Sequence, residues 1–334
     1  MTSQTEPPPR GGETTYLEAI RQAMWEEMER DERVFLIGED VGVYGGAFRT
    51  SADLLRRFGE SRVVETPISE VAIVGSAAGA AMMGMRPIAE MQFIDFISVG
   101  FNSLVNFAAK LRYRNGLACP MVVRGPAGGG VHGGPFHSLS GENYFMNVPG
   151  LKIVAPATPY DAKGLLKSAI RDDDPVIYLE HKYLYRRLKD DLPEDDFTVP
   201  IGKAHIRREG KDLTVITFGA MTLVADEAAA EMEKEGVSLE IIDLRSIKPY
   251  DEEAILSSVK KTSRAIVLHE APRTGGVGGE IVACITEKAF DWLDAPIRRI
   301  AALDTPVPYS PPLETFYRPN SEKLVTAIRE VMAY

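Results

Sequence analysis

The segment from Arg124 to Ser138 combines many glycines with two side chains that can exchange protons near neutral pH. It reads Arg-Gly-Pro-Ala-Gly-Gly-Gly-Val-His-Gly-Gly-Pro-Phe-His-Ser and contains His132 and His137, two of the five histidines in the chain. Glycine permits positive φ and lets the backbone approach a ligand closely, and imidazole changes charge near neutral pH. The segment therefore predicts either a cradle for a phosphate group or an active-site loop that presents a histidine.

The residues after the glycines disfavour the phosphate alternative. Gly128 to Gly133 matches a Gly-x-Gly-x-x-Gly pattern, but Gly134, Pro135 and Phe136 come next, where a dinucleotide site needs the start of a helix. The acidic residue expected about 20 residues further on is missing, and no Lys-Ser/Thr pair completes a P-loop. The pattern favours a loop that presents a histidine, with a glycine-rich surface turn as the alternative.

A second candidate group is Glu70, in the segment Thr-Pro-Ile-Ser-Glu at 66–70. Pro67 ends a short apolar run, and Ser69 has the residue type of a helix N-cap. Glu70 would then lie in the first turn of a helix at the carboxyl edge of a parallel sheet, where such sheets bind ligands. The alternative is a carboxylate that only compensates the helix dipole. The segment Glu-Met-Gln-Phe at 90–93 ends another predicted strand and is a candidate for the lining of a pocket.

Alternating apolar runs and amphipathic stretches predict the elements that position these groups. This rhythm is typical of the α/β class, with two domains that each hold a mostly parallel sheet flanked by helices. In the first half we expect strands at 34–38, 63–65, 87–91, 121–123, 153–155 and 176–180, and helices at 14–30, 71–85, 99–114 and 160–171. In the second half we expect strands at 214–218, 239–242, 265–269 and 297–301, and helices near 223–235, 252–260, 279–293 and 322–332.

Composition narrows the class of protein further. The 334 residues are 45% hydrophobic with a net charge of −10, so a nucleic acid is not expected as a partner. Cys119 and Cys284 have no metal-binding spacing, which fits a reducing compartment. The longest uncharged run, 71–85, is too short to span a bilayer, and its Gly and Ala content predicts a buried, closely packed helix. No apolar targeting segment is seen at the N-terminus, so we expect no membrane association and a cytoplasmic location.

These segments together resemble one family. The order of Thr-Pro-Ile-Ser-Glu, Glu-Met-Gln-Phe and Phe-His-Ser at 136–138, followed by Thr-Pro-Tyr-Asp-Ala-Lys-Gly-Leu-Leu at 158–166 and Ile-Arg-Asp-Asp-Asp-Pro-Val at 170–176, is similar to that of the β subunits of 2-oxo acid dehydrogenases. These subunits belong to the decarboxylating component of pyruvate and branched-chain 2-oxo acid dehydrogenase complexes. Glu-His at 180–181, Asp-Leu-Arg at 243–245 and Asp-Thr-Pro at 304–306 extend the resemblance through the second half.

The resemblance implies a transketolase-like fold and a cofactor, thiamine diphosphate, shared with an α subunit. It implies a tail at 1–13, a pyrimidine-binding catalytic domain at 14–186, a linker at 187–202, and a C-terminal dimerisation and docking domain at 203–334. The chain contains no Gly-Asp-Gly segment of the kind that holds the metal and diphosphate in thiamine enzymes. The resemblance therefore implies that the α subunit holds Mg²⁺ and the diphosphate, in an assembly of two α and two β chains. The tail and the linker are also predicted by composition, because the N-terminal segment is polar with three consecutive prolines and the segment before residue 203 is charged and contains prolines.

The resemblance also assigns roles to single residues. Glu70 matches the glutamate that hydrogen-bonds a ring nitrogen of the cofactor's pyrimidine, and Ile68, Gln92 and Phe96 match positions that line the pyrimidine pocket. Some relatives have tyrosine in place of Phe96, so a hydroxyl hydrogen bond is lost here. His137 matches a histidine that assists reductive acyl transfer to a lipoyl group as an acid or cation. For His132, a chemical role and a place as an ordinary loop residue are equally open.

A structural K⁺ site is a further implication of the resemblance. The matching positions are Met121, Ala169, Ile170, Asp172 and Asp174, and oxygen ligands suit such a cation. Asp174 stands where relatives commonly have asparagine, and a solvated acidic turn is the alternative. The expected partners besides the α subunit are a second β subunit and the lipoyl and subunit-binding domains of the dihydrolipoyl acyltransferase. Two other functions stay open: an acetoin dehydrogenase β subunit, and a subunit that serves chiefly in assembly and docking.

Overall fold

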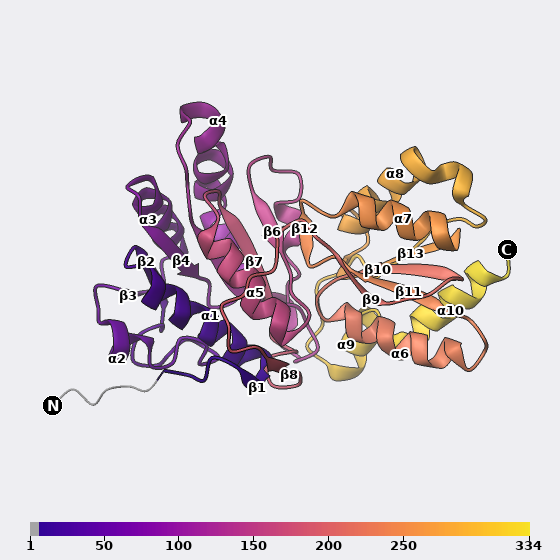
Figure 1. The fold of residues 1–334 in the computed structure, drawn as a ribbon, viewed down its shortest axis with the longest axis horizontal. Coiled ribbons are helices and arrows are strands. Elements are labelled where there is room, and N and C mark those ends of the chain that lie inside the picture. The colour runs from indigo at the N-terminus through magenta and orange to yellow at the C-terminus, as the bar shows by residue number, and fades with distance from the viewer. Residues whose placement is uncertain (1–6) are drawn as a thin grey trace. The chain divides into compact units, whose positions relative to one another are not determined.

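Residues 7–334 are described by a computed structural model, in which the chain divides into two compact units (Figure 1). The first unit comprises the described chain up to Ala127 together with Asn147–Ile201. The second comprises Gly128–Met146 together with Gly202–Tyr334. The strand that leads into the glycine loop therefore belongs to the first unit, whereas the loop itself belongs to the second. The predicted α/β class is confirmed in both units.

A parallel sheet forms the centre of the first unit. Its strands lie in the order β6-β7-β5-β4-β2-β3. They are β2 (Val34–Glu39), β3 (Val63–Thr66), β4 (Arg86–Glu90), β5 (Val122–Ala127), β6 (Lys152–Val154) and β7 (Val176–His181). All the neighbouring pairs are parallel. Each predicted strand of the first half is present, because runs of buried apolar residues with β-branched side chains suit a sheet that is covered on both faces.

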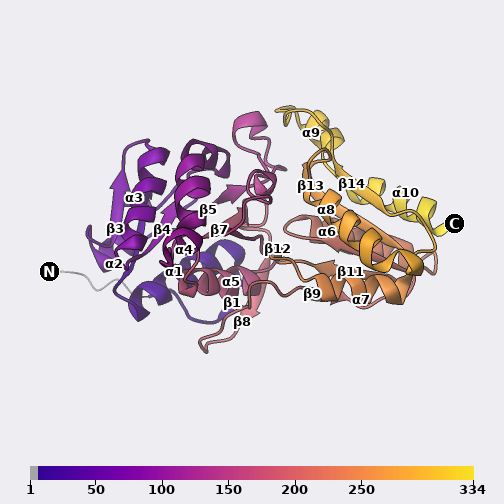
Figure 2. The ribbon, with the colours of Figure 1, turned by 90° about the horizontal axis from the view of Figure 1, so that it is seen from above.

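The α-helices of the first unit are α1 (Tyr16–Arg30), α2 (Leu54–Phe58), α3 (Glu70–Met82), α4 (Leu111–Asn115) and α5 (Pro159–Arg171). Helix α1 begins at a capping box, in which the Thr15 side chain accepts from the N–H of Glu18 and the Glu18 side chain accepts from the N–H of Thr15. Helices α1 and α5 pack against each other and run side by side in both views (Figures 1 and 2).

Two helix predictions differ from the structure. Residues 99–114 do not form one helix: 3-10 segments at Ile94–Gly100 and Ala108–Lys110 flank a π-helical turn at Ser103–Phe107, and only α4 is α-helical. The backbone of Gly100 packs so closely on α3 that a Cβ there would lie 2.6 Å from Val74 Cγ2. Helix α3 is also buried on one face only: its buried residues are Ile73, Val74, Ala77, Ala78 and Ala81, whereas Val71 and Met82 are exposed.

A small antiparallel ribbon occupies segments in which we expected a tail and a linker. Strand β1 (Gly12–Thr15) pairs with β8 (Lys189–Leu192), with Gly12 opposite Leu192 and Thr15 opposite Lys189. The charged and proline-containing composition of residues 187–202 indicated irregular chain, but backbone pairing needs only extended residues and does not depend on apolar side chains. Residues 1–6 of the predicted tail lie outside the described residues.

The second unit has a sheet of five strands in the order β14-β13-β10-β11-β9. Its strands are β9 (His205–Arg208), β10 (Leu213–Thr217), β11 (Leu239–Asp243), β13 (Ala265–Pro272) and β14 (Arg298–Ala302), and a short strand, β12 (Ser246–Lys248), lies outside this sheet. Only β9 runs antiparallel to its neighbour. The α-helices are α6 (Met221–Glu233), α7 (Glu252–Thr262), α8 (Val277–Ala289), α9 (Pro311–Tyr317) and α10 (Ser321–Met332).

Helices cover both faces of this second sheet. Figure 1 shows α7 and α8 on one face and α6 and α10 on the other. The four predicted strands and the four predicted helices of the second half are present, whereas β9, β12 and α9 were not predicted. Within residues 7–334, none of the helices has the length and apolar composition needed to cross a bilayer.

Candidate active site

The carboxyl ends of β2, β3 and β4 bring the first group of predicted site residues to one edge of the sheet. In register, Glu39 lies opposite Thr66, and Gly38 lies opposite both Glu65 and Glu90. Glu70 begins α3 just after β3, and Gln92 follows β4 by two residues. The structure therefore places both at the edge at which parallel sheets bind ligands.

Glu39 is a site residue that the sequence analysis missed. It ends β2 with only 5% of its surface exposed, and its Oε1 accepts the N–H of Ser69 at 3.3 Å. Burial raises the pKa of Glu39, and the nearby charge of Glu70 raises it further. The available signal was an acid at the end of a buried strand, in the run Leu-Ile-Gly-Glu-Asp at 36–40.

Ser69 occupies the predicted N-cap position but does not cap the helix with its side chain. Its hydroxyl donates to the carbonyl of Pro67 at 2.8 Å, and no side-chain bond to the first turn of α3 forms. Because the Ser69 N–H is used by Glu39, the start of α3 is tied to the end of β2 through the backbone. This contact fixes Glu70 beside Glu39.

The other residues predicted for the pyrimidine pocket follow β4 and β3. Gln92 Nε2 donates to Asp40 Oδ2 at 2.8 Å, so this amide lies next to the Glu39 position. Phe96 is half-buried, and its ring meets that of Phe93 edge-on at 6.4 Å between centroids. Ile68 is 83% exposed and projects from the turn before α3. The structure thus links Glu70 and Gln92 through Glu39 and Asp40, with apolar side chains beside them.

A buried ion cluster supports this edge from within the sheet. The Arg124 guanidinium, 1% exposed, pairs with Glu90 on β4 and Glu180 on β7, and donates to Thr50 Oγ1 at 3.0 Å. The hydroxyl of Tyr185 donates to Glu180 at 2.7 Å. Burial raises the pKa of Glu90 to about 7. One arginine between two carboxyl groups thus holds three neighbouring strands in register, which gives Glu90 of the Glu-Met-Gln-Phe segment a structural role.

The glycine loop follows β5 and belongs to the second unit. It is closed by the N–H of Gly128, which donates to the carbonyl of Leu139 at 2.8 Å. A single 3-10 turn, Gly134–Phe136 (η4), lies within it, and no α-helix begins between β5 and α5. The inference that this loop is not a dinucleotide site agrees with that observation. His137 directly follows the 3-10 turn and is half-buried, whereas Phe136 is 64% exposed.

His132 adopts the left-handed conformation, with φ of 62°. Its Nδ1 lies 2.6 Å from Oε2 of Glu314 on α9, so Nδ1–H donates a hydrogen bond to this carboxylate oxygen. A non-glycine residue in this region of φ is uncommon and is kept only where its surroundings hold it. The two loop histidines therefore differ in their surroundings: His132 contacts Glu314 on α9, whereas His137 follows the 3-10 turn η4.

Glu142, which follows the glycine loop and lies in the same unit, is 2% exposed. Burial raises its pKa from 4.5 to about 7, and the charge of Glu270 adds to the rise. The folded state therefore holds a proton on Glu142 more firmly than the unfolded state does. Stability from this proton is complete below about pH 4.5 and is lost as the pH rises through 7.

We expect Glu142→Gln to remove this pH dependence. Because glutamine stays neutral, the variant should gain stability over the unaltered chain on the order of 3 kcal/mol at pH 8, with little difference at pH 4.5. Urea unfolding of the full chain at both pH values measures the difference. An identical pH dependence in both proteins would contradict the expectation.

The residues of the predicted K⁺ site lie near one another but are engaged by protein donors. The carbonyls of Ile170 and Asp172 each accept from Arg86 Nη1 at 3.0 Å. Lys152 Nζ donates to both carboxylate oxygens of Asp172, at 2.8 and 2.6 Å, and Asp174 pairs with Arg112. The carbonyls of Met121 and Ala169 accept backbone N–H groups of Val176 and Asp172. Each of these carbonyl oxygens has a second lone pair, so the contacts do not test the K⁺ site, which stays a prediction.

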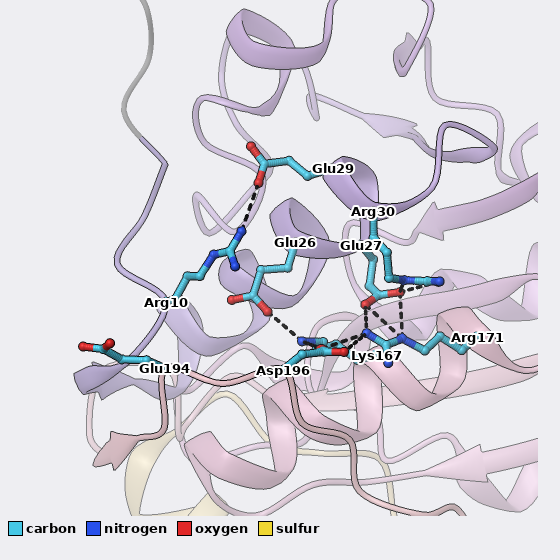
Figure 3. Close-up of a pocket in the computed structure, with 9 residues that line it drawn as sticks. All are labelled: Arg10, Glu26, Glu27, Glu29, Arg30, Lys167, Arg171, Glu194 and Asp196. Atoms are coloured by element: carbon cyan, nitrogen blue, oxygen red, sulfur yellow. Dashed lines mark hydrogen bonds and ion pairs between the residues drawn. The ribbon is translucent and has the colours of Figure 1, made fainter.

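A cavity of about 320 Å³ in the first unit has a structural character (Figure 3). Lys167, 1% exposed, pairs with Glu26 at 2.7 Å and with Asp196. Arg171 pairs with Glu27 at 2.6 Å. The lining residues are Arg10, Glu26, Glu27, Glu29, Arg30, Lys167, Arg171, Glu194 and Asp196. These ion pairs connect α1, α5 and the segment after β8. Because opposite charges are paired within the cavity, its lining does not offer a charged ligand a surface of a single sign.

Comparison with known proteins decides the family. The model of the transketolase pyrimidine-binding domain matches residues 13–187, and that of the transketolase C-terminal domain matches residues 202–324. The chain is 51% identical to the 2-oxoisovalerate dehydrogenase subunit beta of Bacillus subtilis, over 96% of this chain and 99% of that one. The chain belongs to the family of 2-oxo acid dehydrogenase β subunits.

Other members and a solved structure agree with this assignment. The β subunit is 47% identical to the mitochondrial 2-oxoisovalerate dehydrogenase subunit beta 2 of Arabidopsis thaliana, over 95% of this chain and 88% of that one. It is 44% identical to the pyruvate dehydrogenase E1 component subunit beta of Staphylococcus aureus, over 96% and 99%. A split-gene transketolase, solved as an inactive β4 tetramer, has a TM-score of 0.79 at 21% identity over 95% of this chain and 98% of that one. This last likeness confirms the transketolase-like fold.

The edge of the first-unit sheet fits the pyrimidine half of thiamine diphosphate, the cofactor of this family. Glu39, Asp40, Glu65 and Glu70 place four acidic side chains at or just beyond the carboxyl ends of β2 and β3. Carboxyl groups suit the ring nitrogens and amino group of an aminopyrimidine. The same acids would repel a diphosphate. The acidic side chains at this edge therefore suit the pyrimidine half of the cofactor and not the diphosphate half.

Proposed function

We propose that this β subunit, together with an α subunit, decarboxylates a branched-chain 2-oxo acid on thiamine diphosphate and passes the acyl group to a lipoyl group. The observation that carries the proposal is the position of Glu70, which begins α3 beside the buried Glu39 at the carboxyl edge of a parallel sheet. The identity of 51% to a 2-oxoisovalerate dehydrogenase subunit, against 44% to a pyruvate dehydrogenase subunit, favours the branched-chain substrate.

Glu70 is proposed to hold a proton at a ring nitrogen of the pyrimidine. The buried Glu39 lies close to Glu70, and both burial and the charge of Glu70 raise the pKa of Glu39. Gln92, which donates to Asp40, orients the polar side of the pocket, and Ile68 and Phe96 give its apolar side. When bound, thiamine diphosphate supplies the nucleophilic carbon and the electron sink for decarboxylation.

The α subunit is proposed to hold Mg²⁺ and the diphosphate, and two α and two β chains to form the assembly. Support comes from the acidic edge of the first-unit sheet and from exposed apolar side chains of the same unit. Ile68, Val71, Met83 and Tyr113 are each more than half exposed. Large exposed apolar side chains are typical of protein interfaces, and three of these four lie on α3 or next to one of its ends. His137 is proposed to serve acyl transfer, and the C-terminal domain at 203–334 is proposed to serve the docking of the acyltransferase.

Reconstitution tests the proposal. The αβ complex should decarboxylate 2-oxoisovalerate with a kcat/KM at least about tenfold above that for pyruvate, 2-oxoglutarate or acetoin, a ratio within the reach of apolar pocket contacts. The β subunit alone should show no turnover. Full activity without an α subunit would overturn the proposal of a shared site. A preference for pyruvate or acetoin would keep the shared site and overturn the substrate.

A further inference from the structure

Two acids that are distant in sequence from the glycine loop accept hydrogen bonds from its backbone. Glu314 Oε1 accepts the N–H of Gly130 at 2.7 Å, and Glu314 Oε2 accepts the N–H of His132 at 3.2 Å. Glu270 Oε1, on β13, accepts the N–H of Gly129 at 2.5 Å. Together with the bond from His132 Nδ1 to Glu314, four loop donors converge on two carboxyl groups of the same unit.

Both acids are held in place by their surroundings. Glu314 is 1% exposed and Glu270 is 6% exposed. The second oxygen of Glu270 accepts from Arg318 Nη2 at 3.0 Å, so the guanidinium orients the carboxylate toward the loop. Hydrogen bonds to ionised groups are about twice as strong as those between neutral groups. The loop therefore rests on charged acceptors that are already positioned, and its place is not set by its glycines alone.

The loop also needs glycine in order to reach these acceptors. A Cβ at Gly129 would lie 2.7 Å from Glu314 Oε1. A Cβ at Gly134, where φ is +68°, would lie 2.1 Å from Cε1 of Tyr309, in the turn before α9. The segment 309–318 thus contacts the loop closely at two points, where a side chain on the loop would force a neighbouring group to shift. The glycines serve close packing on α9 in addition to any mobility.

We infer that Glu314 is a positioning residue, which latches the glycine loop in the shape that presents His137, with Glu270 as a second anchor. His137 follows the latched His132 by five residues, with the 3-10 turn between them. When the latch is lost, the loop gains other conformations, and the fraction of molecules that present His137 falls in proportion. The part of this inference that concerns acyl transfer rests on the proposed function, and the part that concerns loop order does not.

The test compares Glu314→Gln with Glu322→Gln, which removes an exposed carboxylate from the first turn of α10. Glutamine keeps the shape of the side chain but replaces one of the two acceptor oxygens by a donor. In the full chain, hydrogen exchange of the amides of 129–132 should rise about tenfold or more in Glu314→Gln and stay unchanged in Glu322→Gln. In the αβ complex, kcat for lipoyl acylation should fall about tenfold, with KM for the lipoyl domain within about twofold.

Gly129→Ala supplies a second variant, because it keeps the Glu314 carboxyl group but places a Cβ 2.7 Å from Glu314 Oε1, so that the carboxyl group or the loop must shift. It should loosen the same amides and slow the same acylation step. Unchanged exchange in both variants would overturn the latch. Raised exchange with unchanged acylation would overturn the positioning role. A complex of unaltered chains that acylates no lipoyl domain would contradict the proposed function, while the exchange experiment would still decide the latch.

Discussion

Glu70→Gln is expected to lower the decarboxylation turnover of the αβ complex by about 100-fold or more, because a positioned acid–base group contributes a factor of this order. Glutamine fills the same space at the start of α3 and keeps an oxygen acceptor. Its amide can donate a hydrogen bond to a ring nitrogen but cannot transfer a proton to it or accept one from it. Carbon dioxide release from 2-oxoisovalerate, without acyltransferase and with saturating cofactor, measures this step alone.

The position of Glu70 makes the loss specific to chemistry. The hydrogen bond from the Ser69 N–H to Glu39 does not involve the Glu70 side chain, and neither does the backbone of α3. The fold at this edge of the sheet should therefore persist in the variant. Glu60→Gln removes an exposed carboxylate just before β3 and is the matched control, with turnover expected to be unchanged. Near-full turnover of Glu70→Gln at saturating cofactor would show that this carboxyl group handles no proton in the reaction.

Much of the first unit was predictable from local pattern. Each strand from β2 to β7 was visible as a short apolar run, and Glu70 was placed correctly at the start of a helix because Pro67 and Ser69 mark the boundary. Once parallel strands are assumed, residues that follow them must meet at one edge of the sheet. For this reason the neighbourhood of Glu70 and Gln92 could be inferred without any coordinates.

The features that could not be predicted depend on contacts between distant residues. Glu314 lies 184 residues from Gly130 along the chain, and no local signal connects them. Pairing of β1 with β8 likewise joins residues that are about 180 positions apart, in segments whose composition indicates irregular chain. The oxygen atoms of the predicted K⁺ site were identified by position, but the arginines and lysine that engage them come from other segments of the first unit. Sequence pattern identifies such oxygen atoms, and only the fold shows which protein donors contact them.

His137→Ala is expected to separate the two half-reactions. Acylation of the lipoyl domain should fall by about 100-fold or more, since the variant removes an acid or cation from the transfer step. Decarboxylation of 2-oxoisovalerate, measured with an artificial electron acceptor, should stay within about threefold. The physical reason is that the proton handling proposed for decarboxylation lies with Glu70 and Glu39, on elements of the first unit, whereas His137 lies on the loop of the second unit.

The contacts that hold the glycine loop do not include the His137 side chain among those described above. His132 is bound through Nδ1 to Glu314, and the loop amides are bound to Glu314 and Glu270, so removal of the His137 side chain leaves the latch intact. Hydrogen exchange of residues 129–132 in His137→Ala should therefore match that of the unaltered chain, unlike that of Glu314→Gln. His205→Ala, at the exposed start of β9, controls for loss of an imidazole elsewhere in the same unit. If His137→Ala slowed both half-reactions equally, the histidine would have to act before acyl transfer, and the assignment of decarboxylation to the first-unit acids alone would be wrong.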